Sequence, residues 1–105
     1  MSTVHIWLRK KAEMSDEEFR DYWLHTHAPI ARDGYEHLRG YAANLVTRVP
    51  EGQERPFDGL AELTWEDREG FKIDMASETA AVSTKDLENF TDGFGLLFVE
   101  RHIVK

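Results

Sequence analysis

The side chain best suited to chemistry in this sequence is His27, in the amphipathic stretch Phe19–Ile30, FRDYWLHTHAPI. Its place directly before Ala28-Pro29 puts an ionisable ring on or beside the helix face that is expected to be buried. Burial favours the neutral imidazole, whereas a helix C-terminus favours the imidazolium. Either balance leaves a group that exchanges protons near neutral pH, as a general acid or base must. The alternative is structural: His27 donates to a backbone carbonyl and only caps the helix end.

A metal site at the neighbouring histidine pair is not expected. Two residues turn a helix by about 200°, so His25 lies roughly opposite His27 and faces the surface. A zinc site needs further ligands, and no third candidate stands at a suitable spacing. The chain has no cysteine, which excludes disulfides, thiolate metal ligands and cysteine nucleophiles.

A tyrosine and several aromatic side chains would complete a site around His27. A tyrosine hydroxyl beside His27 would orient a substrate or polarise a carbonyl or enolate oxygen. The family resemblance described below implies that this residue is Tyr41, the second candidate catalytic residue. Glu62 is a carboxylate among apolar neighbours, and it either faces solvent or lines a cavity. Aromatic walls predict an apolar ligand that is aromatic or polycyclic. The candidate substrate-binding residues are His5, Trp7, Phe19, Tyr22, Trp23 and Glu62.

Length and charge limit the classes of function. A chain of 105 residues is one domain, residues 1–105. Its formal charge of −7 argues against nucleic acid or an anionic membrane as a partner, because both need a basic face. No apolar run approaches the ~18 residues of a membrane span, and the first residues lack a signal-peptide core. A cytoplasmic protein is therefore expected.

The first strand and the first helix would position these side chains. Thr3–Arg9 alternates as a strand does, with one apolar face and one face suited to solvent or to a second, more polar cavity. The apolar face has Val4, Ile6 and Leu8, and the other has His5, Trp7 and Arg9. Ser15 is the N-cap of the helix, and Glu18 is its capping-box partner. Because Pro29 disfavours a helical Ala28, the helix should break or restart there and leave His27 at the seam.

The rest of the chain predicts two further strands in a hairpin, two helical segments and a last strand. In order these are Leu38–Val49 with a bulge or close approach at Gly40, the loop Glu51–Arg55, Gly59–Trp65, the helical segments Glu66–Ala76 and Thr79–Thr91, and the strand Leu96–Val104. Asp67 would cap the first of these helices. In the second, Thr84 would restart the helix, and Gly93 and Gly95 would end it.

The order strand, helix, strand, strand, helix, strand is that of the ferredoxin-like βαββαβ fold, in the α+β class. Its helices cover one face of a four-stranded antiparallel sheet and leave the other face open. With this many aromatic residues in so short a chain, the open face is expected to be covered by a partner.

The motif Met14-Ser15-x-Glu17-Glu18-Phe19-x-x-Tyr22-Trp23-x-x-x-His27-Ala28-Pro29-Ile30 resembles the signature of the EthD family, named for ethyl tert-butyl ether degradation. That family belongs to the dimeric α+β barrel superfamily. The stretches LRGY from Leu38, DGLAEL from Asp58 and NFTD from Asn89 continue the resemblance over nearly the whole chain. The stretch Ser77–Thr84 departs from the family pattern.

The resemblance implies a homodimer whose two sheets face each other and close a barrel. Each subunit would keep a pocket between its own sheet and helices. Relatives in the superfamily include muconolactone methylisomerases, cofactor-free monooxygenases, aromatic polyketide cyclases and haem peroxidases. In methylisomerase-like members, a histidine at the position of His27 and a tyrosine at that of Tyr41 line the pocket. Plant polyketide cyclases have a histidine on the first strand, where His5 stands.

These observations predict a cofactor-independent enzyme of the EthD type acting on an apolar, aromatic or polyketide-like metabolite of catabolism or secondary metabolism. Proton transfer through His27 would make it an isomerase, cyclase, dehydratase or decarboxylase. One alternative is an oxidoreductase or monooxygenase that uses O₂ and an oxidisable phenolic substrate. The other is a non-catalytic protein that binds a hydrophobic metabolite. No cofactor is expected, since no axial ligand for haem is evident.

Overall fold

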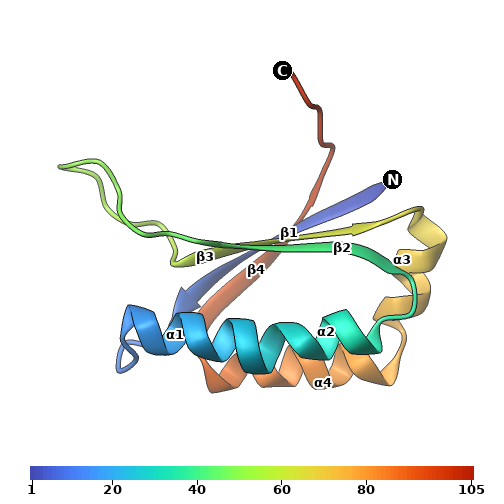
Figure 1. Cartoon of the computed structure of the whole chain (residues 1–105), viewed down its shortest axis with the longest axis horizontal. Coiled ribbons are helices and arrows are strands. Elements are labelled where there is room, and N and C mark those ends of the chain that lie inside the picture. Colours follow the sequence, from blue (N-terminus) through green and yellow to red (C-terminus); the bar gives the residue numbers. More distant parts are fainter.

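The computed structural model describes residues 1–105 and has the predicted order of elements. The strands are β1 (Ser2–Lys10), β2 (Leu38–Leu45), β3 (Gly59–Trp65) and β4 (Thr91–Val99). The helical segments are α1 (Asp16–Tyr22), η1 (Trp23–His27), α2 (Ala28–Gly34), α3 (Arg68–Met75), α4 (Glu78–Asp86) and η2 (Leu87–Asn89). The antiparallel sheet has the order β2-β3-β1-β4, and the helices lie on one side of it (Figure 1). The α+β, ferredoxin-like prediction is confirmed.

The first helix begins as the sequence predicts. The Ser15 hydroxyl accepts a hydrogen bond from the Glu18 backbone N–H at 3.1 Å, and the Glu18 carboxylate accepts one from the Ser15 N–H at 2.9 Å. This capping box satisfies two backbone donors that the helix itself leaves unpaired. It fixes the start of the helix that carries His27.

The helix does not break at Ala28-Pro29, but the predicted restart is found there: α2 begins at Ala28, and His27 lies at its junction with η1. Ala28 has helical dihedral angles (φ −58°, ψ −38°), and η1 runs into α2 without interruption. η1 is a π-helical turn, in which the Ala28 N–H donates to the carbonyl of Trp23, five residues earlier. The wider turn accommodates Pro29, whose ring would clash with a carbonyl of an ordinary α-helix. His27 therefore occupies the last position of a π turn within one long helix.

The core lies between the helices and the sheet. Its buried side chains are Val4, Leu8, Phe19, Trp23, Ala61, Leu63, Trp65, Leu87 and Phe90. The indole of Trp23 lies so close to Gly59 that an added Cβ there would overlap its ring. At the far end of β3, Trp65 Nε1 donates to the buried carboxylate of Asp74 at 2.7 Å, which fastens α3 to the sheet.

β2 is shorter than the predicted strand Leu38–Val49, because it ends at Leu45. Pro50 and Pro56 in the following connection lack the N–H groups that a longer hairpin ladder would need. The irregularity predicted at Gly40 is confirmed by a shift of the β2–β3 register between Leu38 and Gly40.

β4 covers Thr91–Val99 and not the predicted Leu96–Val104. Gly93 and Gly95, expected to end the preceding helix, lie inside the strand. The reason is Trp7 on β1, whose indole would overlap a Cβ at Gly95. Gly95 therefore makes room for a neighbouring side chain, which propensity alone does not reveal.

The second helical region divides at a different place from the one predicted. Asp67 caps α3, as expected, by accepting from the Gly70 N–H at 2.8 Å. Thr84 does not restart a helix, because it lies inside α4, which begins after the Ser77 cap. The short turn η2 then joins α4 to β4.

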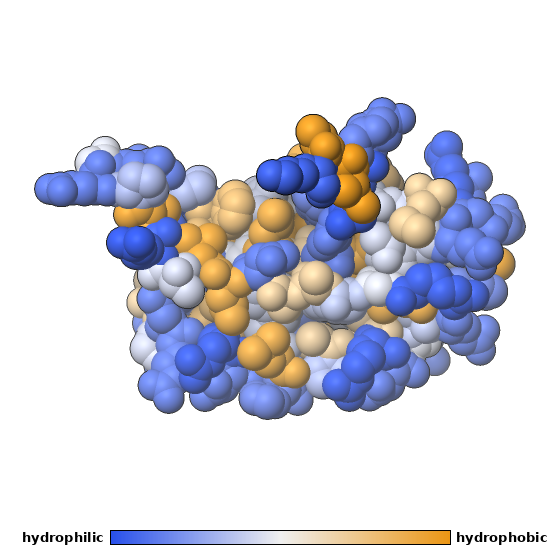
Figure 2. Space-filling model, turned by 45° about the horizontal axis from the view of Figure 1, so that its top comes forward, coloured by the Kyte–Doolittle hydropathy of each residue, from blue (hydrophilic) through white to orange (hydrophobic).

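The second face of the sheet carries no helix. On the side of the molecule turned forward in Figure 2, hydrophobic patches lie between hydrophilic residues. Leu97 of β4 keeps 51% of its surface exposed, and the residues after β4 project away on this side (Figure 1). We refer to it below as the open face. No helix has the length and apolar character needed to cross a membrane.

Candidate functional site

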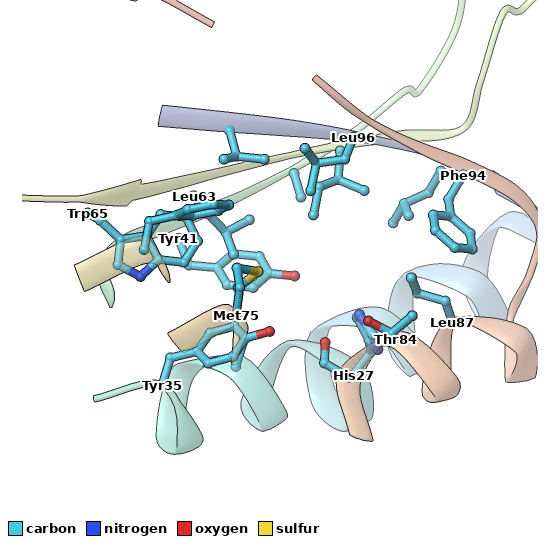
Figure 3. Close-up of a pocket in the computed structure, with 17 residues that line it drawn as sticks. His27, Tyr35, Tyr41, Leu63, Trp65, Met75, Thr84, Leu87, Phe94 and Leu96 are labelled. Carbon is cyan, nitrogen blue, oxygen red and sulfur yellow. The ribbon is translucent and has the colours of Figure 1, made fainter. Parts of the chain in front are cut away.

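A cavity of about 110 Å³ lies between the sheet and the helices. Of its 17 lining residues 14 are hydrophobic, so it suits an apolar ligand. The other three are His27, Ser83 and Thr84, and two of the hydrophobic residues, Tyr35 and Tyr41, add hydroxyl groups. The hydroxyls of Tyr35 and Tyr41 point into this space, and His27 reaches it from the long helix (Figure 3). No lysine, arginine, aspartate or glutamate lines it.

His27 is held by a carboxylate from the opposite helix. Its Nδ1 lies 2.8 Å from Oδ2 of Asp86, at the C-terminal end of α4. The carboxylate places the imidazole proton on Nδ1, because an ionised Asp86 can only accept. Nε2 makes no hydrogen bond. Every fully buried side-chain nitrogen in the chain has a hydrogen-bond partner, so Nε2 is not fully buried. Nε2 therefore keeps accessible surface and presents a free lone pair.

The protonation states of this pair follow from burial and hydrogen bonds. Burial lowers the pKa of His27, which is 6% exposed, and the attraction of Asp86 only partly opposes this. Burial raises the pKa of Asp86, but hydrogen bonds from Tyr22, Asn89 and His27 outweigh it and hold the pKa below its usual value. At neutral pH the pair is thus a neutral imidazole beside an ionised carboxylate.

Asp86 is itself fixed by two further donors. The hydroxyl of Tyr22 donates to its Oδ1 at 2.7 Å, and Asn89 Nδ2 donates to the same oxygen at 2.9 Å. The ring of His27 also packs against Phe90, with centroids 4.8 Å apart. The imidazole is therefore constrained both at its nitrogen and at its face.

Tyr41 faces the same cavity from β2. Trp23 Nε1 donates to the Tyr41 oxygen at 3.0 Å, and the phenol makes no hydrogen bond as a donor within the chain. Burial raises the pKa of Tyr41, so the hydroxyl stays protonated. It is a neutral O–H donor with no acceptor of its own, and a carbonyl oxygen of a ligand would supply one.

Asp86 and Tyr35 belong to this site but were not among the predicted residues. Asp86 stands in the last turn of a helix, where the dipole disfavours a negative charge, and that placement is a usable signal. Tyr35 follows the end of α2, and burial raises its pKa. Neither signal says which other element the side chain meets.

The predicted residues divide between the two faces of the sheet. His27 and Tyr41 line the cavity, while Trp23 and Tyr22 support them through hydrogen bonds. Phe19 is buried in the core and does not line the cavity.

His5, Trp7 and Glu62 lie on the open face, with the sheet between them and the cavity. His5 Nε2 lies 3.4 Å from Glu62 Oε1, and Arg101 lies 3.3 Å from the same carboxylate. The guanidinium of Arg9 stacks on Trp7 at 5.5 Å. A substrate-binding role for these residues stays a prediction, and it concerns a place other than the cavity.

The structure shows no group of three histidine, aspartate or glutamate residues that is arranged to hold a metal ion. His25 is exposed on the outer side of the long helix, as expected.

The model of the EthD domain family matches residues 11–93. An EthD-family protein of Bacillus halodurans is 25% identical and has a similar structure, with a TM-score of 0.79 over 97% of this chain and 100% of that one. An Arabidopsis thaliana protein is 12% identical, with a TM-score of 0.77 over 100% of this chain and 99% of that one. A dimeric ferredoxin-like protein of Thermobifida fusca is 11% identical, with a TM-score of 0.69 over 94% and 90% of the two chains. No curated protein matches the sequence.

Proposed function

This chain belongs to the EthD family, and from that premise we propose that it is a cofactor-independent enzyme that moves a proton on an apolar carbonyl compound. The observation that carries the proposal is the ordered pair His27–Asp86 at an apolar cavity that also receives the free hydroxyl of Tyr41. A base and an oxyanion donor are the two groups that enolisation requires.

In the proposed reaction, His27 Nε2 removes a proton from the carbon next to the substrate carbonyl. The C–H electron pair moves into the new C=C bond, and the carbonyl oxygen gains the charge of an enolate. Tyr41 donates to that oxygen and stabilises the charge as it develops. Asp86 is a positioning residue: it holds Nδ1–H and stabilises the imidazolium that forms.

Return of the proton from Nε2 to another carbon would complete an isomerisation. Attack of the enolate carbon on a second carbonyl of the same substrate would give cyclisation, and loss of a leaving group would give elimination. The site chemistry is the same in each case. The substrate decides which of these follows.

The size of the cavity limits the part of the substrate that reacts. A volume of about 110 Å³ is close to the ~150 Å³ of an engineered cavity that holds one benzene molecule. The reacting end is therefore one ring or a chain of similar volume. Rings beyond the first must lie outside the cavity.

We further propose that the protein is a homodimer whose subunits pack through their open faces. Exposed hydrophobic side chains on β4 and after it, among them Leu97 and Ile103, support this, since a monomer rarely leaves such a patch in water. The Thermobifida fusca protein is dimeric and shares the fold.

The test of the catalytic proposal is deuterium uptake at the acidic methylene carbons of 2-indanone in D₂O, followed by NMR. The wild-type protein should accelerate uptake over buffer, and His27→Ala should remove at least about 10²-fold of the acceleration. His25→Ala, on the exposed side of the same helix, is the matched control and should keep it. Equal acceleration by His27→Ala and wild type would refute the role of His27. Binding of 2-indanone without exchange would instead favour a ligand-binding protein.

A further inference from the structure

A second depression opens at the end of the sheet where β1 begins and β4 ends. It has a volume of about 320 Å³ and is lined by Ser2, Val4, Arg68, Phe71, Lys72 and Phe98. Three of these side chains are hydrophobic and two carry a positive charge. We call it the cationic groove. It plays no part in the chemistry at His27.

The two cations of the groove have no counter-charge of their own. Arg68 and Lys72 stand four residues apart on α3, so they project on the same side of the helix. Neither takes part in an ion pair, although five other arginines of the chain do. In a protein with a formal charge of −7, this groove offers an anion two free donors above an apolar floor.

The groove adjoins the cavity at His27, because Val4 and Phe71 line both. Phe71 stands between the two spaces. Its ring meets Trp65 on the cavity side at 5.0 Å and Phe98 on the groove side at 5.7 Å, edge to face in both cases. A ligand that extended from the cavity past Phe71 would enter the groove that Arg68 and Lys72 line.

Two other depressions share residues with the cavity, and neither matches the groove in charge. The first shares Met75, Thr84 and Phe94 with the cavity and contains both Lys85 and Glu88, so opposite charges lie beside each other.

The second shares Tyr41 with the cavity and is lined by Arg32 and Arg39 without a carboxylate. Both arginines already take part in ion pairs, Arg32 with Asp33 and Arg39 with Glu66. Of the three depressions, only the groove at α3 has cations with neither an ion pair nor a carboxylate in the lining.

From this arrangement we propose that the cationic groove binds the carboxylate, or an equivalent anionic head, of a ligand whose ring occupies the cavity at His27. The substrate class is then an amphiphilic anion: one ring or apolar chain with the reacting carbonyl at one end, and an acid group at the other. The inference rests on the proposed function only in placing the reacting end at His27.

The experiment is calorimetric titration with 6-phenylhexanoate and its uncharged analogue 6-phenylhexanamide, which differ in charge but hardly in shape. Wild type should bind the acid roughly five- to tenfold more tightly than the amide at low salt, as expected for two exposed ion pairs. The preference should shrink at 0.5 M NaCl, where the Debye length falls to roughly 4 Å. Arg68→Gln/Lys72→Gln should remove the preference and leave the affinity for the amide unchanged.

Arg48→Gln/Lys85→Gln is the matched control, because it removes the same charge elsewhere and should keep the preference. All four side chains are exposed or at the surface, so folding is not at risk, and equal thermal midpoints would verify this. Equal affinities of wild type for acid and amide, or no detectable binding of the acid, would overturn the proposal. So would a preference that survives in Arg68→Gln/Lys72→Gln. These outcomes are independent of the His27→Ala result, because they measure binding and not exchange.

Discussion

On each face of the sheet a tryptophan ring packs against a glycine, but the two rings differ in burial and in their contacts. On the covered face Trp23 lies against Gly59, and on the open face Trp7 lies against Gly95. Trp23 is fully buried and its N–H is bonded to Tyr41, so that its position supports the cavity. Trp7 is only partly buried and carries Arg9 on its ring.

The two faces also differ in their proposed roles, catalysis on the covered face and subunit association on the open face. Every group proposed to react lies on the covered face, with its partners in the same chain: His27 with Asp86, and Tyr41 with Trp23. The open face has apolar side chains and the cluster of His5, Glu62 and Arg101, but no layer above them. One chain therefore holds every group of the proposed site, whereas the proposed dimer would cover the open face with a second copy.

The largest effect is expected on the covered face, from Asp86→Asn. An amide can donate to Nδ1 and so favours the tautomer with its proton on Nε2, the wrong one for a base. Acceleration of 2-indanone exchange should fall by roughly 10²–10⁴-fold. Asp21→Asn, on the exposed side of α1, should leave the rate unchanged. A rate for Asp86→Asn within twofold of wild type would mean that Asp86 does not position the base.

On the open face, Leu97→Asp should disrupt the proposed dimer. A carboxylate buried at the interface without a partner weakens association by roughly 3–5 kcal/mol, or more than about 10²-fold in Kd. Light scattering after size exclusion should show the mass fall from two chains to one. Leu24→Asp, on the exposed surface of the long helix, should remain a dimer. A wild-type protein that is already monomeric would contradict the two-face comparison itself.

The two glycines allow a direct comparison of the faces. Gly59→Ala should lower the free energy of unfolding by about 1–3 kcal/mol, since the buried Trp23 has no room to move away. Gly95→Ala should lower the free energy of unfolding by less in dilute monomeric protein, because Trp7 can turn toward solvent. Urea denaturation of both variants in the Leu97→Asp background would compare their free energies of unfolding. Equal losses of stability would show that both indole rings are equally fixed.

The smallest effect is the pH dependence of stability that His27 contributes. Its folded pKa is lowered, mainly by burial, so the unfolded chain binds the proton more readily. The free energy of unfolding should therefore fall as the pH drops from the unfolded value near 6.5 toward the lowered folded value. His27→Gln should lose that part of the slope between pH 7.5 and pH 5.5 in urea denaturation, whereas His25→Gln should retain it. An identical slope in His27→Gln and wild type would show that burial does not perturb this histidine.

Local patterns determined a large part of this protein. The alternation of β1 and β3, the Ser15–Glu18 capping box and the order of the elements follow from neighbours in the chain, and the structure has them as predicted. His27 and Tyr41 were also predicted from the sequence, His27 as an ionisable ring on an apolar helix face and Tyr41 through the family resemblance, and both line the cavity. Their catalytic roles stay predictions.

Contacts between distant residues decided the rest. Asp86 meets His27 across 59 positions, and no spacing rule links an aspartate on one helix to a histidine on another. The glycine at position 95 inside β4 is matched to Trp7 on β1, and the unbroken helix depends on a π turn that relieves the proline. The sheet also separates His5, Trp7 and Glu62 from the cavity. Alternation along the first strand already predicted that His5 and Trp7 share a face, but only the tertiary structure shows that the cavity lies on the other one. Residue types determined what chemistry is available, and tertiary packing decided which groups meet to perform it.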